Sequence, residues 1–215
     1  MIENFGDAPF FRGDAPPVTV AAMTACAVAV RMEVAKIPLG INVLRNDVAA
    51  ALSIACVVGA QVVRVNVHSG ARITDQGIVE GRAADTLRLR KNLGAEAIEI
   101  WADVDVKHSA PLAARPIEEE ALENFERGLA DALLVTGSGT GVPVDGSDLA
   151  RIRKAVPDAA IYVASGARIL DLENLAEHAS GVIVGTALRA SGKAGDPIDP
   201  ALARAFAKAF RKAFG

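Results

Sequence analysis

The chain has 215 residues, of which 51% are hydrophobic, 23% charged and only 4% aromatic, and its formal net charge is -3. This length fits one domain and falls slightly short of the roughly 250 residues of a complete eight-stranded barrel. No long basic run is present, so the surface has no obvious attraction for phosphate backbones and we expect no nucleic-acid partner.

The start of the chain argues against export. Residues 1–4 have neither the basic start nor the apolar core of a signal peptide. The longest apolar stretch, residues 18–30, is shorter than the roughly 20 residues of a membrane span, and we interpret it as a buried helix. Cys26 and Cys56 lie in alanine-rich helical stretches and are expected to be buried apolar side chains. We predict a cytoplasmic protein; peripheral association with a membrane and a homo-oligomeric state stay open.

Short β-branched runs alternate with longer helical stretches along the chain. Each strand-to-strand step is about 20 to 35 residues, the length of a βαβ crossover. Repeated units of this kind predict a parallel sheet, either closed into a barrel or open and doubly wound. A short strand is expected at residues 2–4, followed by strands at 39–44, 62–67, 97–101, 132–136, 161–164 and 181–185. Helices are expected at residues 18–35, 47–58, 81–93, 117–130, 147–155, 170–178 and 200–214.

Two features favour the barrel. No G-x-G-x-x-G sequence opens an early helix, and the glycine-rich turns follow the last three strands, where barrels bind phosphate. We therefore predict one α/β domain over residues 1–215, a TIM-type (β/α) barrel. Because a closed barrel needs eight strands, we expect it to be incomplete, with the first strand–helix unit missing at the N-terminus.

Polar residues interrupt the predicted strands. In residues 63–68, Arg64, Asn66 and His68 alternate with valines, so this set shares one face and points into the barrel while the valines pack on helices. Burying Arg64 without a partner would cost several kcal/mol, which predicts an anionic partner. That partner is Glu99 or Asp103 of an internal ion-pair network, or a bound ligand.

Other polar residues fall near the carboxyl ends of strands, where barrel active sites are built. Asn42 lies within the second strand, and Arg45-Asn46-Asp47 follows it, although Asp47 is also a natural N-cap for the next helix. The long loop 69–77, which carries Asp75 and Gln76, is interpreted as a lid or binding element. Lys107 beside His108 is a candidate Schiff-base or general-base site; the alternative is a solvated loop lysine.

Glycine-rich turns follow three consecutive strands. Such turns let the backbone approach a ligand closely and direct N–H groups at an anion, although left-handed turns after strands use glycine for other reasons too. We expect a phosphorylated small molecule as the ligand. The turns are Gly137-Ser138-Gly139-Thr140-Gly141, Ser165-Gly166 and Gly185-Thr186.

Eight segments closely resemble the BtpA/SgcQ family, and together they extend over essentially the whole chain. They are ENFGDAPF (3–10), TVAAMT (19–24), PLGINVLRND (38–47), RVNV (64–67), TDQGIVEG (74–81), ADVDVKH (102–108), VTGSGTG (135–141) and VGTALR (184–189). The resemblance implies a barrel related to the phosphate-binding barrels and a link to photosystem I biogenesis or to sugar uptake. Similar proteins begin with a further strand, a proline-rich loop and a helix. Met1 is then either an internal methionine, the explanation we favour, or the start of a shortened chain.

The resemblance places motif residues at matching positions of this sequence. They are Glu3, Asn4, Asp7, Asn42, Arg45, Asn46, Asp47, Arg64, Asn66, Asp75, Gln76, Asp103, Lys107, His108, Gly137, Gly141, Gly166 and Gly185.

Three functional hypotheses remain. The first is an isomerase, lyase or glycosidic-bond enzyme of a phosphorylated substrate, in which Asp103, Lys107 or Asp75 moves protons and Arg64, Asn42 and Asn66 orient the substrate. The other motif residues except Asp7, together with Ser165 and Thr186, would bind substrate. The alternative is a non-catalytic assembly factor for a membrane complex such as photosystem I. No cofactor is predicted; Mg²⁺ held by Asp75, Asp103, Asp105 and His108 is a lower-ranked variant.

Overall fold

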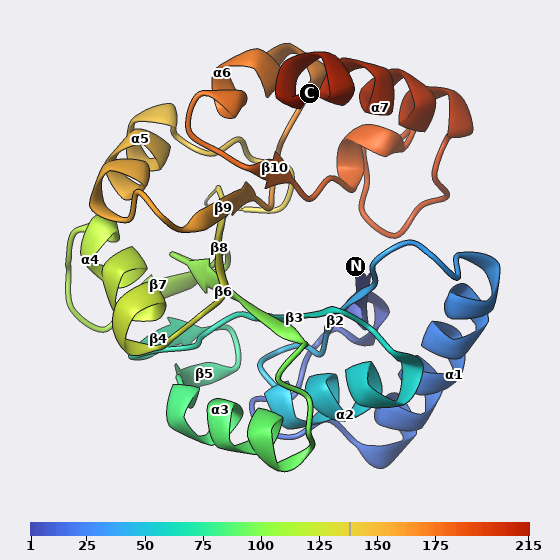
Figure 1. Ribbon diagram of the computed structural model, residues 1–215, viewed down its shortest axis with the longest axis vertical. Helices are drawn as coiled ribbons and strands as arrows, with labels where there is room; N and C mark the ends of the chain where they lie inside the picture. Colours follow the sequence, from blue (N-terminus) through green and yellow to red (C-terminus); the bar gives the residue numbers. More distant parts are fainter. Residues whose placement is uncertain (138) are drawn as a thin grey trace.

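The computed structural model describes residues 1–137 and 139–215. Seven parallel strands form one sheet in the order β1-β2-β3-β6-β8-β9-β10, which follows the chain. Figure 1 shows this sheet curled into a ring, with the helices outside it. Within the described residues β1 pairs only with β2 and β10 only with β9, so the ring is open between them. The strands are β1 (Ile2–Glu3), β2 (Gly40–Asn42), β3 (Val62–Val65), β6 (Glu99–Val104), β8 (Ala132–Val135), β9 (Ala160–Val163) and β10 (Gly181–Val182).

This architecture confirms the prediction of an α/β fold of the TIM-barrel type. Aspartate side chains cap three of the helices, and Asp47 accepts the N–H of Ala50 at the start of α2 as its position in the sequence suggests. The helix expected at 117–130 is α4 followed by a π-helical turn. The helices are α1 (Pro17–Glu33), α2 (Val48–Val58), α3 (Ala83–Asn92), α4 (Ile117–Leu122), the turn η2 (Glu123–Arg127), α5 (Gly146–Ala155), α6 (Leu172–Ala176) and α7 (Pro200–Phe214). None of the helices in the described part of the chain is both long and apolar enough to cross a membrane.

The apolar core lies between the sheet and the helices. On β6, Ile100 and Ala102 are fully buried in the two apolar clusters formed with the helices. Because side chains alternate along a strand, Trp101 and Asp103 point to the other side, into the ring. There Trp101 stacks on Tyr162 of β9, with ring centroids 4.2 Å apart. The barrel interior is therefore aromatic at this level and polar at the level of Asp103.

Helix α1 contradicts the expectation of a buried helix. Of its residues only Met23 and Ala27 are buried, whereas Val18 and Met32 are 74% and 79% exposed. The helix packs against α2 and β1 at one end of the row of helices, so no second helix covers its other side. The same expectation is wrong for the cysteines, because Cys26 and Cys56 are both exposed.

The loop expected at residues 69–77 is instead part of a second, antiparallel sheet. Strand β4 (Ala71–Thr74) pairs on one side with β5 (Gly77–Glu80) and on the other with β7 (Ser109–Pro111). Arg72, which is 3% exposed, holds this sheet to the barrel wall. Its guanidinium binds Glu120 Oε2 at 2.7 Å and Ser109 Oγ at 2.6 Å, and it pairs with the carboxylate of Asp105.

Several strand boundaries also differ from expectation, most of all those of β6. Strand β6 begins at Glu99 and ends at Val104, later than the predicted 97–101, because Glu99 N–H bonds Gln61 O and Ile100 N–H bonds Asp131 Oδ2 at its start. Strand β10 stops at Val182, and the following residues turn into the short helix η4 (Thr186–Leu188).

We predict that Arg72→Met strongly destabilises the protein. The substitution leaves Glu120 buried without its counter-charge, and burial already raises the pKa of this carboxyl. Removing one partner of a buried pair costs about 3–5 kcal/mol. Urea unfolding measures the change, with Arg168→Met, which breaks an exposed pair with Asp171, as a control expected to change little. Equal losses in the two variants would show that Arg72 does not anchor the second sheet.

Candidate functional site

Arg64 occupies the centre of the open ring. Its guanidinium, 4% exposed, binds both carboxylate oxygens of Asp103, with Nη2 3.0 Å from Oδ1 and Nε 3.1 Å from Oδ2. Nη1 lies 3.1 Å from Glu3 Oε1. Burial disfavours the charged guanidinium, but the carboxylates of Asp103 and Glu3 outweigh this effect and raise the pKa of Arg64. The expected anionic partner is thus Asp103, with Glu3; Glu99 instead accepts the indole N–H of Trp101.

Two asparagines extend this network along neighbouring strands. Asn66 Nδ2 donates to Asp103 Oδ2 at 2.5 Å, and Asn42 Nδ2 donates to Asn66 Oδ1 at 3.2 Å. Both oxygens of Asp103 are therefore engaged, so Asp103 positions Arg64 and Asn66 in this state of the site. The Asn42 Oδ1 atom is buried and has no hydrogen-bond partner among the described residues. Asn42 itself lines the second cavity described below.

His68 does not join this group, although the alternation of residues 63–68 predicted that it would. Strand β3 ends at Val65, so the period of two stops before His68. Its ring instead approaches the segment after η2, where Nε2 lies 2.8 Å from Gly128 O. Burial lowers the pKa of this histidine, which favours its neutral form.

Three of the predicted substrate-binding residues hold loops together. Asn4 bonds both the N–H and the C=O of Leu44. Asn46 does the same for Val67, and Asp47 accepts N–H groups from Ala50 and Ala15. These side chains fix the loops that carry the site, and none of them lines its cavities.

Lys107 lies in the loop between β6 and β7 and is fixed by its backbone. Its N–H donates to Thr136 Oγ1 at 3.1 Å, and its C=O accepts from Arg45 Nη2 at 2.7 Å. Within residues 1–137 and 139–215 the ammonium makes no ion pair or hydrogen bond. Burial lowers the pKa of Lys107, and the positive charge of Arg64 lowers it further. The charges of Glu3 and Asp103 act in the opposite direction.

The neighbours of Lys107 add to this positive environment. His108 bonds Thr140 Oγ1 through Nε2 at 3.0 Å, and desolvation followed by the charge of Lys107 lowers its pKa. Arg45 is 4% exposed, and burial lowers its pKa. Its Nε atom is also without a partner in the described part of the chain.

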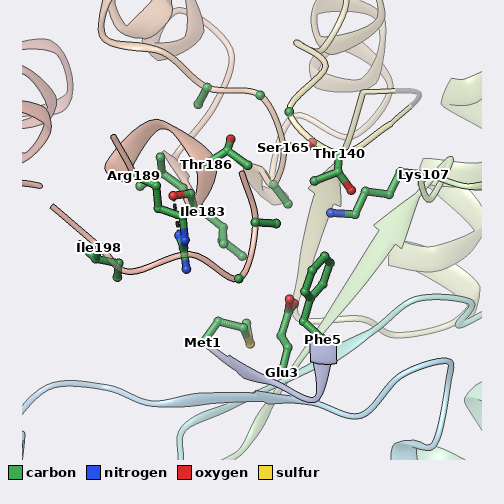
Figure 2. A pocket seen from close by; sticks show the side chains of 18 of the residues that line it. Met1, Glu3, Phe5, Lys107, Thr140, Ser165, Ile183, Thr186, Arg189 and Ile198 are labelled. Atoms are coloured by element: carbon green, nitrogen blue, oxygen red, sulfur yellow. Dashed lines mark hydrogen bonds between the residues drawn. The ribbon is translucent and has the colours of Figure 1, made fainter. Parts of the chain in front are cut away.

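Two adjoining cavities open at the carboxyl ends of the strands. The first is about 350 Å³ and the second about 280 Å³. Figure 2 shows Lys107 and Thr140 entering the first cavity from one side, Arg189 and Thr186 from the other, and Glu3 and Phe5 from below. The second cavity is lined by Asn42, Arg45, Asn66, Asp75 and His108, among others. Both cavities share the residues Glu3, Phe5, Arg64, Lys107 and Thr140.

The turn between β4 and β5 supplies Asp75 to the second cavity. Asp75 and Gln76 occupy the tip of this hairpin, and Gln76 Nε2 donates to Asp75 Oδ2 at 2.6 Å. Gln76 itself lines neither cavity. The hairpin thus places a carboxylate at the margin of the site, as a lid element would.

The glycines of the three turns serve two different purposes. A Cβ on Gly137 or on Gly166 would lie 2.2 Å from Val142 O, and Gly166 also has a φ of +67°. Both glycines therefore let the loop at Val142 pack closely, which is a structural requirement. A Cβ on Gly185 would meet nothing nearer than Arg189 Nη1 at 3.7 Å, and Gly141, with a φ of +78°, lies beside Thr186. Ser138 of the first turn lies outside the described residues.

Arg189 also lines the first cavity. The sequence did not indicate it as a site residue, although it lies in one of the segments that resemble the family. Its Nη1 donates to Gly185 O and its Nε to Asp196 O, both at 2.6 Å. It brings a guanidinium to the end of the first cavity formed by Gly185 and Thr186. The sequence could have indicated this residue, because it is a basic residue four positions after Gly185 of the last glycine turn.

The acidic residues considered for Mg²⁺ are engaged elsewhere. Asp103 pairs with Arg64, and Asp105 pairs with Arg72. No group of three or more histidine, cysteine or acidic side chains in the described residues is arranged to hold a metal ion.

Together these features define a class: an α/β barrel protein with a cation-rich, polar double cavity at the carboxyl ends of its strands. The chain belongs to the BtpA family, whose model matches residues 1–212. It is 40% identical over 209 residues to the photosystem I biogenesis protein BtpA of Synechocystis, covering 97% of this chain and 72% of that protein. An uncharacterized protein of Methanocaldococcus jannaschii is 45% identical over 199 residues, covering 93% of this chain and 74% of that protein.

Solved structures share the fold at low sequence identity. N-(5'-phosphoribosyl)anthranilate isomerase from Pyrococcus furiosus matches with a TM-score of 0.60 at 18% identity, over 88% of this chain and 80% of that chain. Orotidine 5'-phosphate decarboxylase from Pyrococcus horikoshii matches with a TM-score of 0.58 at 19% identity, over 91% and 84%. Both likenesses concern the fold alone.

The two kinds of glycine predict different responses to the same substitution. Gly166→Ala should destabilise the protein, by about 1–3 kcal/mol from the left-handed backbone alone and further through the clash with Val142. Gly185→Ala should cost less, because its backbone is not left-handed and an added Cβ would meet nothing nearer than 3.7 Å. Urea unfolding of both variants measures the difference, and similar stabilities would contradict the assignment.

Proposed function

We propose that the chain is an enzyme that binds a phosphorylated sugar or nucleoside-like small molecule in the double cavity. The observation that carries this proposal is the charge of the lining. Lys107 and Arg189 face the first cavity with no carboxylate partner among the described residues, whereas Arg64 is neutralised by Glu3 and Asp103. An anionic ligand complements such a surface, and the long-range field of the cations also favours its approach.

The phosphate of the ligand belongs at the end formed by Gly185, Thr186 and Arg189. Gly185 leaves space for a close approach of the ligand, and the hydroxyl and guanidinium of its neighbours supply donors. Guanidinium groups recognise phosphate through charge-assisted hydrogen bonds. The hydroxyl of Ser165 lines the same cavity, although it already donates to Gly139 O at 3.1 Å.

The remainder of the ligand extends toward the polar centre. Asn42 and Asn66 line the second cavity, where amide groups suit the hydroxyl groups of a sugar. Lys107 and Glu3 lie where the two cavities meet, and Asp75 lies at the margin, so these are the residues proposed to move protons.

A ligand screen by thermal shift tests the proposal. Sugar phosphates and nucleoside monophosphates should stabilise the chain, by about 2.7 kcal/mol at a hundredfold excess over Kd, and their dephosphorylated forms should not. Gly185→Val, which fills the open space at the phosphate end, should abolish the shift. Gly146→Val is the matched control, since a Cβ at Gly146 also meets nothing within 4 Å and this residue lines neither cavity.

Arg189→Ala provides a second test that does not depend on filling space. It should weaken binding of phosphorylated ligands while leaving the urea midpoint close to that of the parent protein. If the parent protein and both glycine variants bound the ligand equally well, the phosphate would not lie at Gly185. That result would overturn the assignment of the phosphate to this end of the cavity. Absence of any shift across the panel would overturn the proposal itself.

A non-catalytic role in assembly of a membrane complex is the second candidate. It is favoured by the name of the Synechocystis relative and by the apolar outer surface of α1, which exposes Val18, Val28, Val30 and Met32. Apolar patches of this kind are typical of docking surfaces. If this role holds, the protein should sediment with membranes, and the Val18→Glu and Met32→Glu variants should lose this sedimentation. The Gly185→Val variant should retain it. The enzyme hypothesis predicts that the substitutions on α1 do not change sedimentation.

A further inference from the structure

We propose that Lys107 forms an imine with the carbonyl carbon of an open-chain sugar phosphate bound in the double cavity. This inference rests on the proposed function and deepens it, because it names both the substrate class and the covalent step. The substrate is a phosphorylated aldose or ketose whose phosphate lies at Gly185 and Arg189 and whose carbonyl lies at Lys107.

The position of the amine is the first argument. Lys107 lines both cavities and extends into the first of them, opposite Arg189 and Thr186. A ligand with its phosphate at Arg189 therefore extends toward Lys107 across a space of about 350 Å³. That volume is at the lower end of the range for small-molecule pockets.

The surroundings of the amine are the second argument. Asp103 and Glu3 already neutralise Arg64, and within the described residues neither of them forms an ion pair with Lys107. Burial lowers the pKa of Lys107, and the cations Arg64 and Arg45 act in the same direction, against the carboxylates Glu3 and Asp103. A lysine that is desolvated beside other cations keeps a larger neutral fraction and is activated as a nucleophile.

The fixed backbone is the third argument. Thr136 and Arg45 hold the N–H and C=O of Lys107, while the flanking residues Asp105 and His108 have φ values of 51° and 59°. Left-handed conformations at residues other than glycine cost free energy and cluster at functional sites. A solvated loop lysine, the alternative from the sequence, would need none of these constraints.

The chemistry balances with groups that the cavity contains. The lone pair of Nζ adds to the carbonyl carbon, the C=O π pair moves to oxygen, and a proton passes from nitrogen to that oxygen to give a carbinolamine. Loss of this hydroxyl with a second proton, as water, gives the C=N bond. Glu3, the carboxylate common to both cavities, is the group assigned to transfer these protons.

Reductive trapping tests the inference on the full chain. The protein is incubated near neutral pH with ribose 5-phosphate or dihydroxyacetone phosphate and sodium borohydride, which reduces an imine to a stable secondary amine. Peptide mass spectrometry should find the adduct at Lys107. Lys154, an exposed lysine of α5, is the internal control. Lys107 should react severalfold faster, because a bound phosphate holds the carbonyl beside it and burial lowers the pKa of this amine.

Two variants separate the covalent step from binding. Lys107→Arg keeps a positive charge and should retain the thermal shift with sugar phosphates while losing the adduct. Gly185→Val should lose both, because the ligand is no longer held. Ribose and dihydroxyacetone, which lack the phosphate, should label Lys107 no faster than Lys154.

The outcomes distinguish the two proposals. A thermal shift without a Lys107 adduct would overturn the imine and leave the proposed function standing. An adduct that forms equally with and without phosphate, and is unaffected by Gly185→Val, would overturn the substrate class. Labelling of Lys107 at the rate of Lys154 would identify it as an ordinary surface amine.

Discussion

The burial of one guanidinium sets the arrangement of the whole site. Arg64 is 4% exposed in the interior of a curled sheet, where an uncompensated charge would be untenable. Its compensation comes from Glu3 at the end of β1 and from Asp103 on β6, so a single side chain links three strands that are distant in the sequence. Asn66 and Asn42 then satisfy the remaining acceptors. Breaking a pair of this kind costs more than forming it contributes, which makes the network a strong determinant of how these strands meet.

Much of the fold follows from the sequence because it depends on local periodicity. Alternation of β-branched and helical stretches predicted the seven parallel strands, and the valines around Arg64 predicted that it faces inward. Periodicity places Glu99 and Asp103 on one face, but only the depth along β6 decides which of them meets Arg64. The second sheet could not be predicted, because β7 contributes three residues that pair with β4 more than thirty positions earlier. The exposure of α1 depends on its place at the end of the row of helices, which its own sequence does not encode.

Glycine illustrates the same limit within the candidate site. The three turns look alike in sequence, yet Gly137 and Gly166 are required by the approach of Val142 O, whereas Gly185 borders open space. Counting glycine-rich turns therefore overstates how many of them face a ligand. Arg189 could not be selected from the sequence for a related reason. Its guanidinium reaches the cavity only because η4 turns the chain back over Gly185. The phosphate end of the cavity is better assigned from this cation and the free space than from the glycines alone.

The remaining question is why one cation of the site is a lysine while the others are arginines. Arg64 and Arg45 engage fixed partners, a carboxylate pair and the Lys107 carbonyl, through planar guanidinium groups that stay charged even when buried. A lysine buried among these groups instead loses its proton more readily, and it is left without a carboxylate partner in the described structure. The two arginines thus act together. Arg45 holds the backbone of Lys107 in place, and the positive charge of Arg64 favours the neutral form of the Lys107 amine. Burial beside this ion-pair network is, on this view, what favours the neutral, reactive form of the amine.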